Sequence, residues 1–353
     1  MRILLISRKY PPAIGGMQAY SKNLIIHLSR YHKVRTILLR GRQVKLFWFL
    51  PYAFSKAVFL AAKKDYDCLY LCDAALAPIG FFIKRIFGIP VFITVHGLDI
   101  TFDNYFYQAL VPRLIRTFNK VICVSNNTAR ECAKRGINKS LCAFIPNGMD
   151  PAEYAIGMEP AKALNRLEAA LGVDLDNKKI LLTVGRLVKR KGVSWFIEHV
   201  FRNLSSGYVY MVVGDGPERL NISRLVQSLR LEKRVYILGR LDKAMLSLLY
   251  NCAYLFVMPN QNVKNDPEGF GIVAIEAASC GLPSIVNAVD GISDAVLESK
   301  TGYLVKNNDA GLFIDKIENS NFNKGNVKGA SMAFAWENII KRYDDLLKRE
   351  LCF

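Results

Sequence analysis

The sequence lacks the features that would make it a membrane-spanning or secreted protein. It has no run of about 18 or more consecutive apolar residues, which a transmembrane helix needs. The opening stretch Met1–Ser7 is too short for the apolar core of a signal peptide, and it runs directly into Arg8 and Lys9. We therefore expect no spanning helix and no signal peptide.

Paired cysteines and nucleic-acid motifs are also missing. The eight cysteines, at positions 68, 72, 123, 132, 142, 252, 280 and 352, include no CxxC pair. Most of them lie in apolar runs, so we expect reduced structural thiols in a cytosolic protein and no metal site. No zinc-finger spacing or RNP pattern is present, and we expect no nucleic-acid partner.

Acidic residues are scarce in the first part of the chain. Residues 1–150 carry 22 Lys and Arg against 7 Asp and Glu, a net charge of +15, whereas residues 151–353 carry 26 against 23, a net of +3. Such a basic segment favours an anionic partner. Because aromatic and apolar residues accompany the charge, we expect an anionic membrane surface.

Short apolar runs recur along the chain and are separated by helical or polar segments. This alternation predicts parallel strands joined by crossover helices, in an α/β protein with two Rossmann-like, doubly wound domains. We expect domains at residues 1–150 and 151–335, joined by a linker within 146–177. The expected strands are Ile3–Ile6, Thr36–Leu39, Leu69–Cys72, Val91–Val95, Val121–Val124, Cys142–Ile145, Ile180–Val184, Tyr208–Val213, Val235–Leu238, Tyr254–Met258, Ser284–Val286 and Tyr303–Val305.

The segment 267–305, PEGFGIVAIEAASCGLPSIVNAVDGISDAVLESKTGYLV, is the most informative stretch. Gly269 and Gly271 allow a tight turn that leads into a helix, whose N-terminus favours a phosphate group. Glu268 precedes that helix and can reach the reacting end of a ligand. Glu276 lies about one turn inside and can accept hydrogen bonds from vicinal hydroxyls such as those of a ribose. The pattern therefore indicates a sugar nucleotide.

Cationic residues follow another expected strand. Arg186 offers a planar fork for phosphate oxygens, and Lys191 offers a point charge at the start of the next helix. The alternative is a solvated charge run. In the first part, the Gly15-Gly16 pair opens a helix that suits a diphosphate or an acceptor, although a plain turn is the default. His96, at a strand's carboxyl end, can hydrogen-bond a reacting sugar as a neutral imidazole; a buried structural histidine is the alternative.

Taken together, these motifs resemble the signature of the family-four retaining glycosyltransferases of group 1, which have the GT-B fold. Further matching stretches are PNGMD at 146–150, GRLVKRKG at 185–192, GDGPE at 214–218 and LGR at 238–240. The resemblance implies that Gly214 and Arg240 lie at the nucleotide. It also implies that the last helix, from about residue 336 to 353, returns to the first domain.

The resemblance implies a role for each matched residue. Arg186, Lys191 and the amides of Phe270, Gly271 and Ile272 would stabilise the leaving diphosphate electrostatically, without a metal or another cofactor. Glu268 would hold the sugar hydroxyls, Glu276 the ribose, and His96 would lie near the transferred sugar. Asp99 could assist the acceptor hydroxyl. Retaining enzymes imply attack from the side of the leaving group.

Two aromatic stretches can be interpreted either as core helices or as segments that face a membrane. Residues 43–62 interleave Phe47, Trp48, Phe49, Tyr52, Phe54 and Phe59 with Lys45 and Lys56, which suits a membrane interface or a core helix broken at Pro51. Residues 105–120 have a similar mixture, with Arg113, Arg116 and Lys120. Asp65 and Asp67 form a DxD pattern, which we interpret as a solvated strand start and not as a metal site.

We therefore expect a hexosyl- or N-acetylhexosaminyltransferase. It would move sugar from a nucleotide-diphosphate donor to a lipid-linked or lipid-anchored saccharide of a surface polysaccharide or lipopolysaccharide, peripherally on the cytoplasmic membrane face. A glycosyltransferase with a soluble acceptor and a GT-B sugar-nucleotide epimerase are the alternatives. A phosphorylase would show a pyridoxal lysine and usually a longer chain. A dinucleotide oxidoreductase would have GxGxxG after the first strand, which this sequence lacks.

Overall fold

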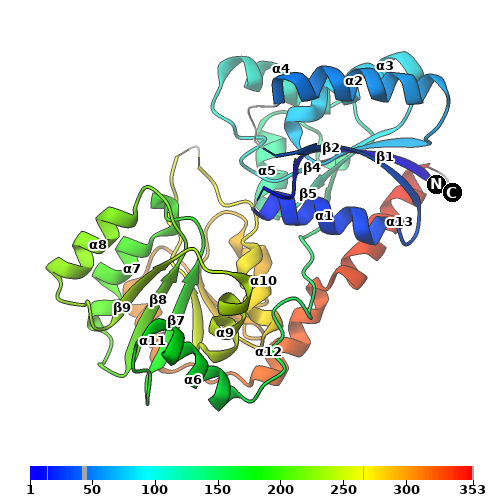
Figure 1. Ribbon diagram of the computed structural model, residues 1–353. Coiled ribbons are helices and arrows are strands. Elements are labelled where there is room, and N and C mark those ends of the chain that lie inside the picture. The colour runs from blue at the N-terminus through cyan, green and yellow to red at the C-terminus, as the bar shows by residue number, and fades with distance from the viewer. Residues whose placement is uncertain (14, 42–45, 265, 352–353) are drawn as a thin grey trace. The chain divides into compact units, whose positions relative to one another are not determined.

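The computed structural model describes residues 1–13, 15–41, 46–264 and 266–351, which form two compact units. The first unit comprises Met1–Gly148, Asn265–Phe270 and Trp336–Phe353, and the second comprises Met149–Lys264 and Gly271–Ala335. Within the described residues, each unit has one six-stranded parallel sheet with helices on both faces (Figure 1). The predicted α/β class with two doubly wound sheets is confirmed.

The first unit has the strand order β2-β1-β3-β4-β5-β6. Parallel strands that are covered on both faces bury every side chain, which is why they appear in the sequence as continuous apolar runs. All five residues of β4 are buried, for example. The elements are β1 (Arg2–Tyr10), α1 (Gly16–Leu28), β2 (Lys33–Arg40), α2 (Leu46–Ala62), β3 (Cys68–Leu71), α3 (Ala77–Phe87), β4 (Val91–Val95), α4 (Tyr105–Ile115), β5 (Lys120–Cys123), α5 (Asn126–Lys134), β6 (Cys142–Phe144) and α13 (Trp336–Leu351).

The second unit has the strand order β12-β11-β10-β7-β8-β9. Helices α7, α8 and α11 contribute to one apolar core against this sheet. The elements are α6 (Pro160–Leu171), β7 (Lys179–Val184), α7 (Val193–His199), β8 (Tyr208–Val213), α8 (Arg219–Ser228), β9 (Val235–Gly239), α9 (Lys243–Cys252), β10 (Leu255–Met258), α10 (Ile272–Ser279), β11 (Ser284–Asn287), β12 (Gly302–Val305), α11 (Ala310–Glu318) and α12 (Lys324–Ser331).

Helix α13 completes one face of the first unit by packing beside α1. The ring of Trp336 stacks on that of His27, with centroids 5.5 Å apart. The hydroxyl of Tyr343 lies 3.0 Å from that of Tyr20, which in turn lies 2.7 Å from the Thr94 hydroxyl. Each of these buried hydroxyls thus has a partner within the core, as buried polar groups require.

Helix α2 corrects the expectation that a core helix would break at Pro51. The helix continues through this proline as one element. Proline there removes the single N–H that would bond the carbonyl of Phe47, and the other helical bonds remain. Phe49 and Leu60 are buried whereas Trp48 is exposed, so the stretch is both core and surface. The part of this expectation that concerns residues 43–45, with Lys45, lies outside the described residues, as does Cys352.

We predict that Trp336→Ala lowers the free energy of unfolding of the first unit by about 3–5 kcal/mol, because it removes a fully buried indole from a packed core. Urea denaturation followed by circular dichroism measures the change. Glu337→Ala, on the exposed side of α13, is the matched control and should change it by less than about 0.5 kcal/mol. Equal midpoints for the two variants would contradict the role given to α13.

Candidate active site

In the second unit, the loops after β7, β8 and β10 pack main chain against main chain at the carboxyl edge of the sheet. A Cβ added to Gly214 would lie 1.8 Å from the carbonyl oxygen of Gly185. A Cβ on Gly192 would lie 1.9 Å from the carbonyl oxygen of Pro259. Both glycines also have positive φ angles, of +135° and +65°. Since only glycine fits, a ligand at this edge can approach the backbone closely.

Two predicted cationic residues lie at this edge. Arg186 directly follows Gly185 and is exposed. Lys191 ends the short 3-10 turn Lys189–Lys191 and is buried, and its Nζ lies 3.7 Å from the position of a Cβ on Gly185. The ammonium group is therefore folded back over the loop after β7. The structure brings both cations to the same glycine-lined loop.

The loop after β9 and the start of α10 belong to the same part of the second unit. The amide of Gly214 donates to the carbonyl of Gly239, 2.7 Å away, and exposed Arg240 comes next in the chain. Helix α10 begins after Gly271, where a Cβ would lie 3.2 Å from the Met258 side chain at the end of β10. No side chain caps the first turn of α10. The amides from Ile272 onward and the helix dipole therefore favour an anion here.

Glu276, inside α10, is held by two tyrosines that the sequence did not single out. Tyr250 donates a hydrogen bond of 3.1 Å to Glu276 Oε2, and the ring of Tyr154 meets that of Tyr250 edge to face at 5.1 Å. Burial and the neighbouring carboxylate of Glu153 raise the pKa of Glu276 to about 7, although the tyrosine hydrogen bonds oppose this rise. Glu276 therefore changes charge near neutral pH.

In the first unit, His96 lies buried directly after β4. Its Nε2 is 3.0 Å from the carbonyl oxygen of Cys72. Because a carbonyl only accepts, Nε2 is the donor, and in a neutral imidazole Nδ1 is the acceptor. The imidazole packs edge to face on Tyr20, with centroids 4.7 Å apart. These contacts fix the ring at the carboxyl edge of the sheet.

Asp99 braces the loops around His96. Its Oδ1 accepts from the His96 amide at 2.7 Å, and its Oδ2 accepts from the Ala74 amide at 3.0 Å. Burial raises the pKa of this carboxyl. Since both oxygens already serve backbone donors, the side chain ties the loop after β3 to the loop after β4.

Arg8 and Asp73 form a second polar pair at this edge, which the sequence analysis missed. Arg8 Nε donates to Asp73 Oδ1 at 2.7 Å, and the Asp73 side chain is fully buried. Among the described residues, Asp73 Oδ2 has no hydrogen-bond partner. Asp73 comes immediately after the strand expected at Leu69–Cys72, and Arg8 comes two residues after the strand expected at Ile3–Ile6, within what the structure shows as β1. These positions were the available signal.

The loop that carries Glu268 and Phe270 groups with the first unit. A Cβ on Gly269 would lie 2.2 Å from the carbonyl oxygen of His96, so the main chain of this loop lies directly against the loop after β4. Phe270 is buried and Glu268 is half-buried. The structure thus brings Glu268 and His96 into one neighbourhood of the first unit.

Gly15 and Gly16 lie after β1, as predicted from the sequence. Gly15 caps α1, because its carbonyl accepts from the amides of Gln18 and Ala19 at 3.1 and 3.0 Å. Both glycines are exposed. In the second unit, Arg186, Lys191, Gly214, Arg240, Gly271, Ile272 and Glu276 form the corresponding set of predicted residues.

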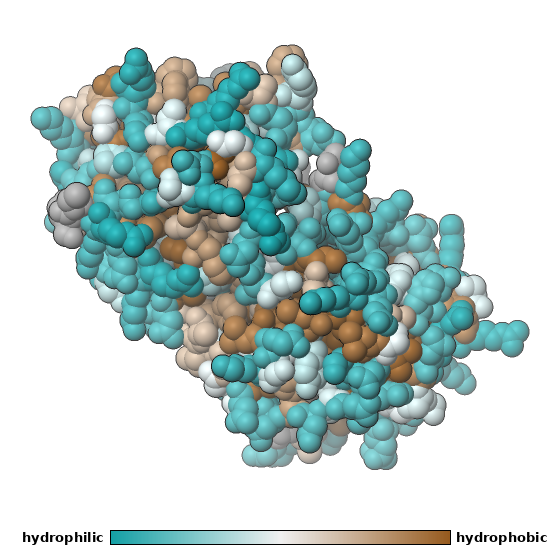
Figure 2. All heavy atoms as spheres, turned by 180° about the vertical axis from the view of Figure 1, so that it is seen from behind, coloured by the Kyte–Doolittle hydropathy of each residue, from teal (hydrophilic) through white to brown (hydrophobic). Residues whose placement is uncertain are grey.

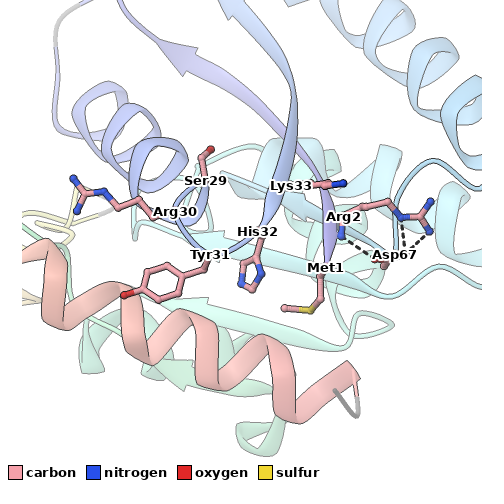
Figure 3. A pocket seen from close by; sticks show the side chains of 8 residues that line it. All are labelled: Met1, Arg2, Ser29, Arg30, Tyr31, His32, Lys33 and Asp67. Atoms are coloured by element: carbon pink, nitrogen blue, oxygen red, sulfur yellow. Dashed lines mark hydrogen bonds and ion pairs between the residues drawn. The ribbon is translucent and has the colours of Figure 1, made fainter.

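Asp65 and Asp67 lie at the amino end of β3, the edge opposite to the one that carries His96. Asp67 accepts from the Arg2 amide at 2.8 Å and Arg2 Nε at 3.1 Å, beside a cavity of about 550 Å³ (Figure 3). Asp65 pairs with Arg35 at 2.9 Å. Both carboxylates thus lie at the partly solvated start of a strand, as expected, and in addition each pairs with an arginine.

Known proteins match the chain over most of its length. Residues 14–153 match the family described as Glycosyltransferase Family 4, and residues 172–320 match Glycosyl transferases group 1. An uncharacterized glycosyltransferase of Methanocaldococcus jannaschii is 26% identical over 99% of this chain and 98% of its own. The Escherichia coli UDP-Gal:alpha-D-GlcNAc-diphosphoundecaprenol alpha-1,3-galactosyltransferase is 26% identical over 73% of this chain and 67% of its own.

Solved structures match the fold of the whole chain. The crystal structure of Anabaena HepE in complex with UDP and glucose has a TM-score of 0.79 at 19% identity, and the match covers 99% of this chain and all of the other. The two family matches and the two parallel sheets agree. The chain therefore belongs to the family-four glycosyltransferases of group 1.

Proposed function

We propose that this protein is a retaining glycosyltransferase that takes its sugar from a nucleoside-diphosphate donor. The observation that carries the proposal is the carboxyl edge of the second unit. There, Arg186 and Lys191 lie at a loop so closely packed that only glycine fits, and α10 begins at the same edge with Glu276 one turn inside. The names of the relatives, which include a UDP-galactose-dependent enzyme, support this donor class.

Departure of the diphosphate is the costly event, because negative charge grows on its oxygens as the bond to the sugar breaks. Arg186, Lys191 and the amides at the start of α10 would stabilise that charge, so we propose that no metal ion is needed. Glu276 would accept hydrogen bonds from the ribose hydroxyls. Gly214 and Arg240 would adjoin the nucleoside.

The first unit would supply contacts to the sugar and the acceptor. Glu268 and His96 would bind hydroxyls of the transferred sugar, His96 through Nδ1 as an acceptor. Asp73 Oδ2, buried and without a described partner, suits a hydroxyl of the acceptor. The bond from the anomeric carbon to the phosphate oxygen breaks, and the acceptor oxygen bonds that carbon on the same face. The hydroxyl proton passes to the departing phosphate.

The acceptor side of the proposal rests on an apolar surface over α2, α3 and α4, which lie side by side in the first unit (Figure 1). We name it the aromatic face. Phe47 and Trp48 are 79% and 77% exposed, and tan and brown side chains reach the surface of this unit in Figure 2. Other exposed large apolar residues of the face are Tyr52, Phe59, Phe82, Ile86, Phe102, Tyr105, Phe106 and Leu110. A patch of this kind marks an interaction site.

Lysines border the aromatic face. Lys56 Nζ lies 3.1 Å from the Tyr52 hydroxyl, and Lys63 Nζ lies 4.3 Å from the ring centroid of Phe59. Arg113 is exposed on α4, but Lys120 is in β5, where it pairs with Glu350, which corrects its placement on this face. Rings flanked by cations suit an anionic membrane interface.

An apolar cavity of about 390 Å³ opens within the aromatic face, lined by Leu50, Pro51, Phe54, Pro78, Ile79 and Phe82. We propose that the protein attaches peripherally to the cytoplasmic face of a membrane and glycosylates a lipid-linked saccharide during surface-polysaccharide assembly. No helix among the described residues has the length and apolarity to cross a bilayer. A soluble acceptor or an epimerase reaction would leave the aromatic face without a role.

We predict that Arg186→Ala and Lys191→Ala each lower turnover by roughly a hundredfold or more, because each removes a charge that stabilises the leaving group. A panel of uridine and guanosine diphosphate sugars first identifies the donor through its slow hydrolysis. Arg202→Ala, at an exposed position before β8, is the matched control and should retain turnover. Near-normal turnover of both test variants would remove these residues from the proposed role.

We predict that binding of a nucleotide sugar tightens as pH rises from 6 to 8, by up to about tenfold. Ribose hydroxyls favour the charged form of Glu276, whose pKa is raised to about 7 in the free protein, so binding at lower pH must also remove a proton. A nucleotide sugar is used because its diphosphate does not titrate in this range. Glu276→Gln should bind more weakly and without this pH dependence. An identical pH profile in both proteins would argue against the ribose assignment.

We predict that the protein sediments with anionic liposomes at low salt and less at moderate salt, since screening weakens the lysine contacts. The double change Phe47→Ser and Trp48→Ser should lower partitioning by about tenfold or more, because two rings lose their apolar environment. Leu220→Ser, which alters a 69% exposed leucine of the second unit, is the matched control. Equal, negligible pelleting of wild type in every condition would exclude membrane attachment.

A further inference from the structure

Three cysteines that are far apart in the sequence meet in the first unit. Cys123 ends β5, Cys132 lies in α5 and Cys142 begins β6. Their sulfur atoms all lie within 4.8 Å of one another, and the Sγ atoms of Cys123 and Cys132 are 4.0 Å apart. Among the described residues, this is the one group of three potential metal ligands that lie so close together.

The pairing of β5 with β6 explains why the sulfurs converge. Cys142 is in register with Val121, and Val121 and Cys123 are two residues apart on one strand. Side chains two apart on a strand share a face, so Cys123 and Cys142 point to the same side of the sheet. Helix α5 packs on that side and buries Thr128 and Cys132, one turn apart.

The geometry of the cluster is close to that of a three-coordinate site. A metal–sulfur distance of about 2.3 Å in a planar trigonal arrangement places the sulfurs about 4 Å apart. The Sγ atoms of Cys123 and Cys132 already have this separation. Because all three sulfurs lie within 4.8 Å of one another, no pair is more than about 0.8 Å too far apart. Rotation about the cysteine side-chain bonds covers such a difference, so the backbone can remain in place.

The donor set selects the type of cation. Thiolates are soft ligands that prefer Cu(I) and related cations, whereas structural Zn(II) requires four ligands. Cys123 and Cys132 are buried within the apolar core, and no histidine or carboxylate among the described residues completes a fourth position. The seven described cysteines are all free thiols, so these three are available as ligands.

We propose that Cys123, Cys132 and Cys142 bind one soft monovalent cation, Cu(I), in a three-coordinate site in the first unit. Thiol protons leave to solvent as the thiolates bind, and copper stays in the Cu(I) state throughout. None of the three cysteines is among the residues assigned to glycosyl transfer, so this proposal does not depend on the proposed function. The alternative is that the three thiols only fill apolar space, as buried cysteines often do.

The test is an anaerobic titration of the reduced, metal-free full chain with Cu(I), in competition with a chromophoric Cu(I) chelator. We expect one Cu(I) per chain to be retained, with three sulfur ligands seen by X-ray absorption. Cys142→Ser alters the half-buried member and should weaken this binding by more than about tenfold, since changes even outside the ligand shell cost 10–100-fold. Cys132→Ala should do the same.

The matched control is Cys252→Ser, which removes a half-buried thiol of the second unit and should leave the affinity unchanged. Circular dichroism verifies that each variant is folded, and Cys142→Ser and Cys132→Ala provide two independent substitutions. The proposal is overturned if wild type retains no Cu(I) against the chelator, if Cys142→Ser binds as tightly as wild type, or if Zn(II) displaces Cu(I) from the site.

Discussion

The close packing of main chain at the carboxyl edge of the second sheet is the constraint on which the candidate site depends. Gly192 and Gly214 lie where backbone atoms of neighbouring loops would overlap any side chain, and the backbone that Gly214 approaches is that of Gly185. The parallel strands all end at this edge, so the loops that follow them lie close together. The absence of a side chain at Gly192 and Gly214 allows their main chains to come into contact. This places polar backbone groups and the exposed Arg186 at the surface of this edge, with the buried Lys191 directly beneath the loop, and such an arrangement suits an anionic ligand.

The first unit organises its edge differently, through buried polar side chains. Asp99 uses both carboxylate oxygens to join two loops, and Asp73 uses one oxygen for Arg8. His96 is fixed by a carbonyl on one side and a tyrosine ring on another. The second unit thus uses close packing at glycines, and the first unit uses hydrogen-bonded side chains. Both arrangements produce a rigid sheet edge on which a few exposed polar groups have a defined orientation.

The sequence predicted the strands well because the central ones, such as β3, β4 and β8, are buried on both faces, which produces an uninterrupted apolar run. It also placed His96, Arg186 and Glu268 directly after such runs or before a helix. Contacts between residues that are distant in the sequence could not be predicted from the sequence. Nothing local indicated that Tyr154 and Tyr250 adjoin Glu276, or that cysteines nine and ten positions apart meet. The sequence also left open whether α2 lies in the core or at the surface. In the structure, one face of this helix packs in the core and the other face is exposed to solvent.

Helix α13 has a consequence for how the protein forms during synthesis. Helix α13 covers core residues that are translated early, including Leu5, Tyr20 and Leu24. The helix itself is translated only after the whole second unit. At about 5–20 residues per second, the ribosome needs tens of seconds to supply it. During that interval the part of this core that α13 covers stays exposed to solvent and to chaperones, although α1 already packs on the same face. The order of elements along the gene therefore makes the second unit the earlier one to finish folding.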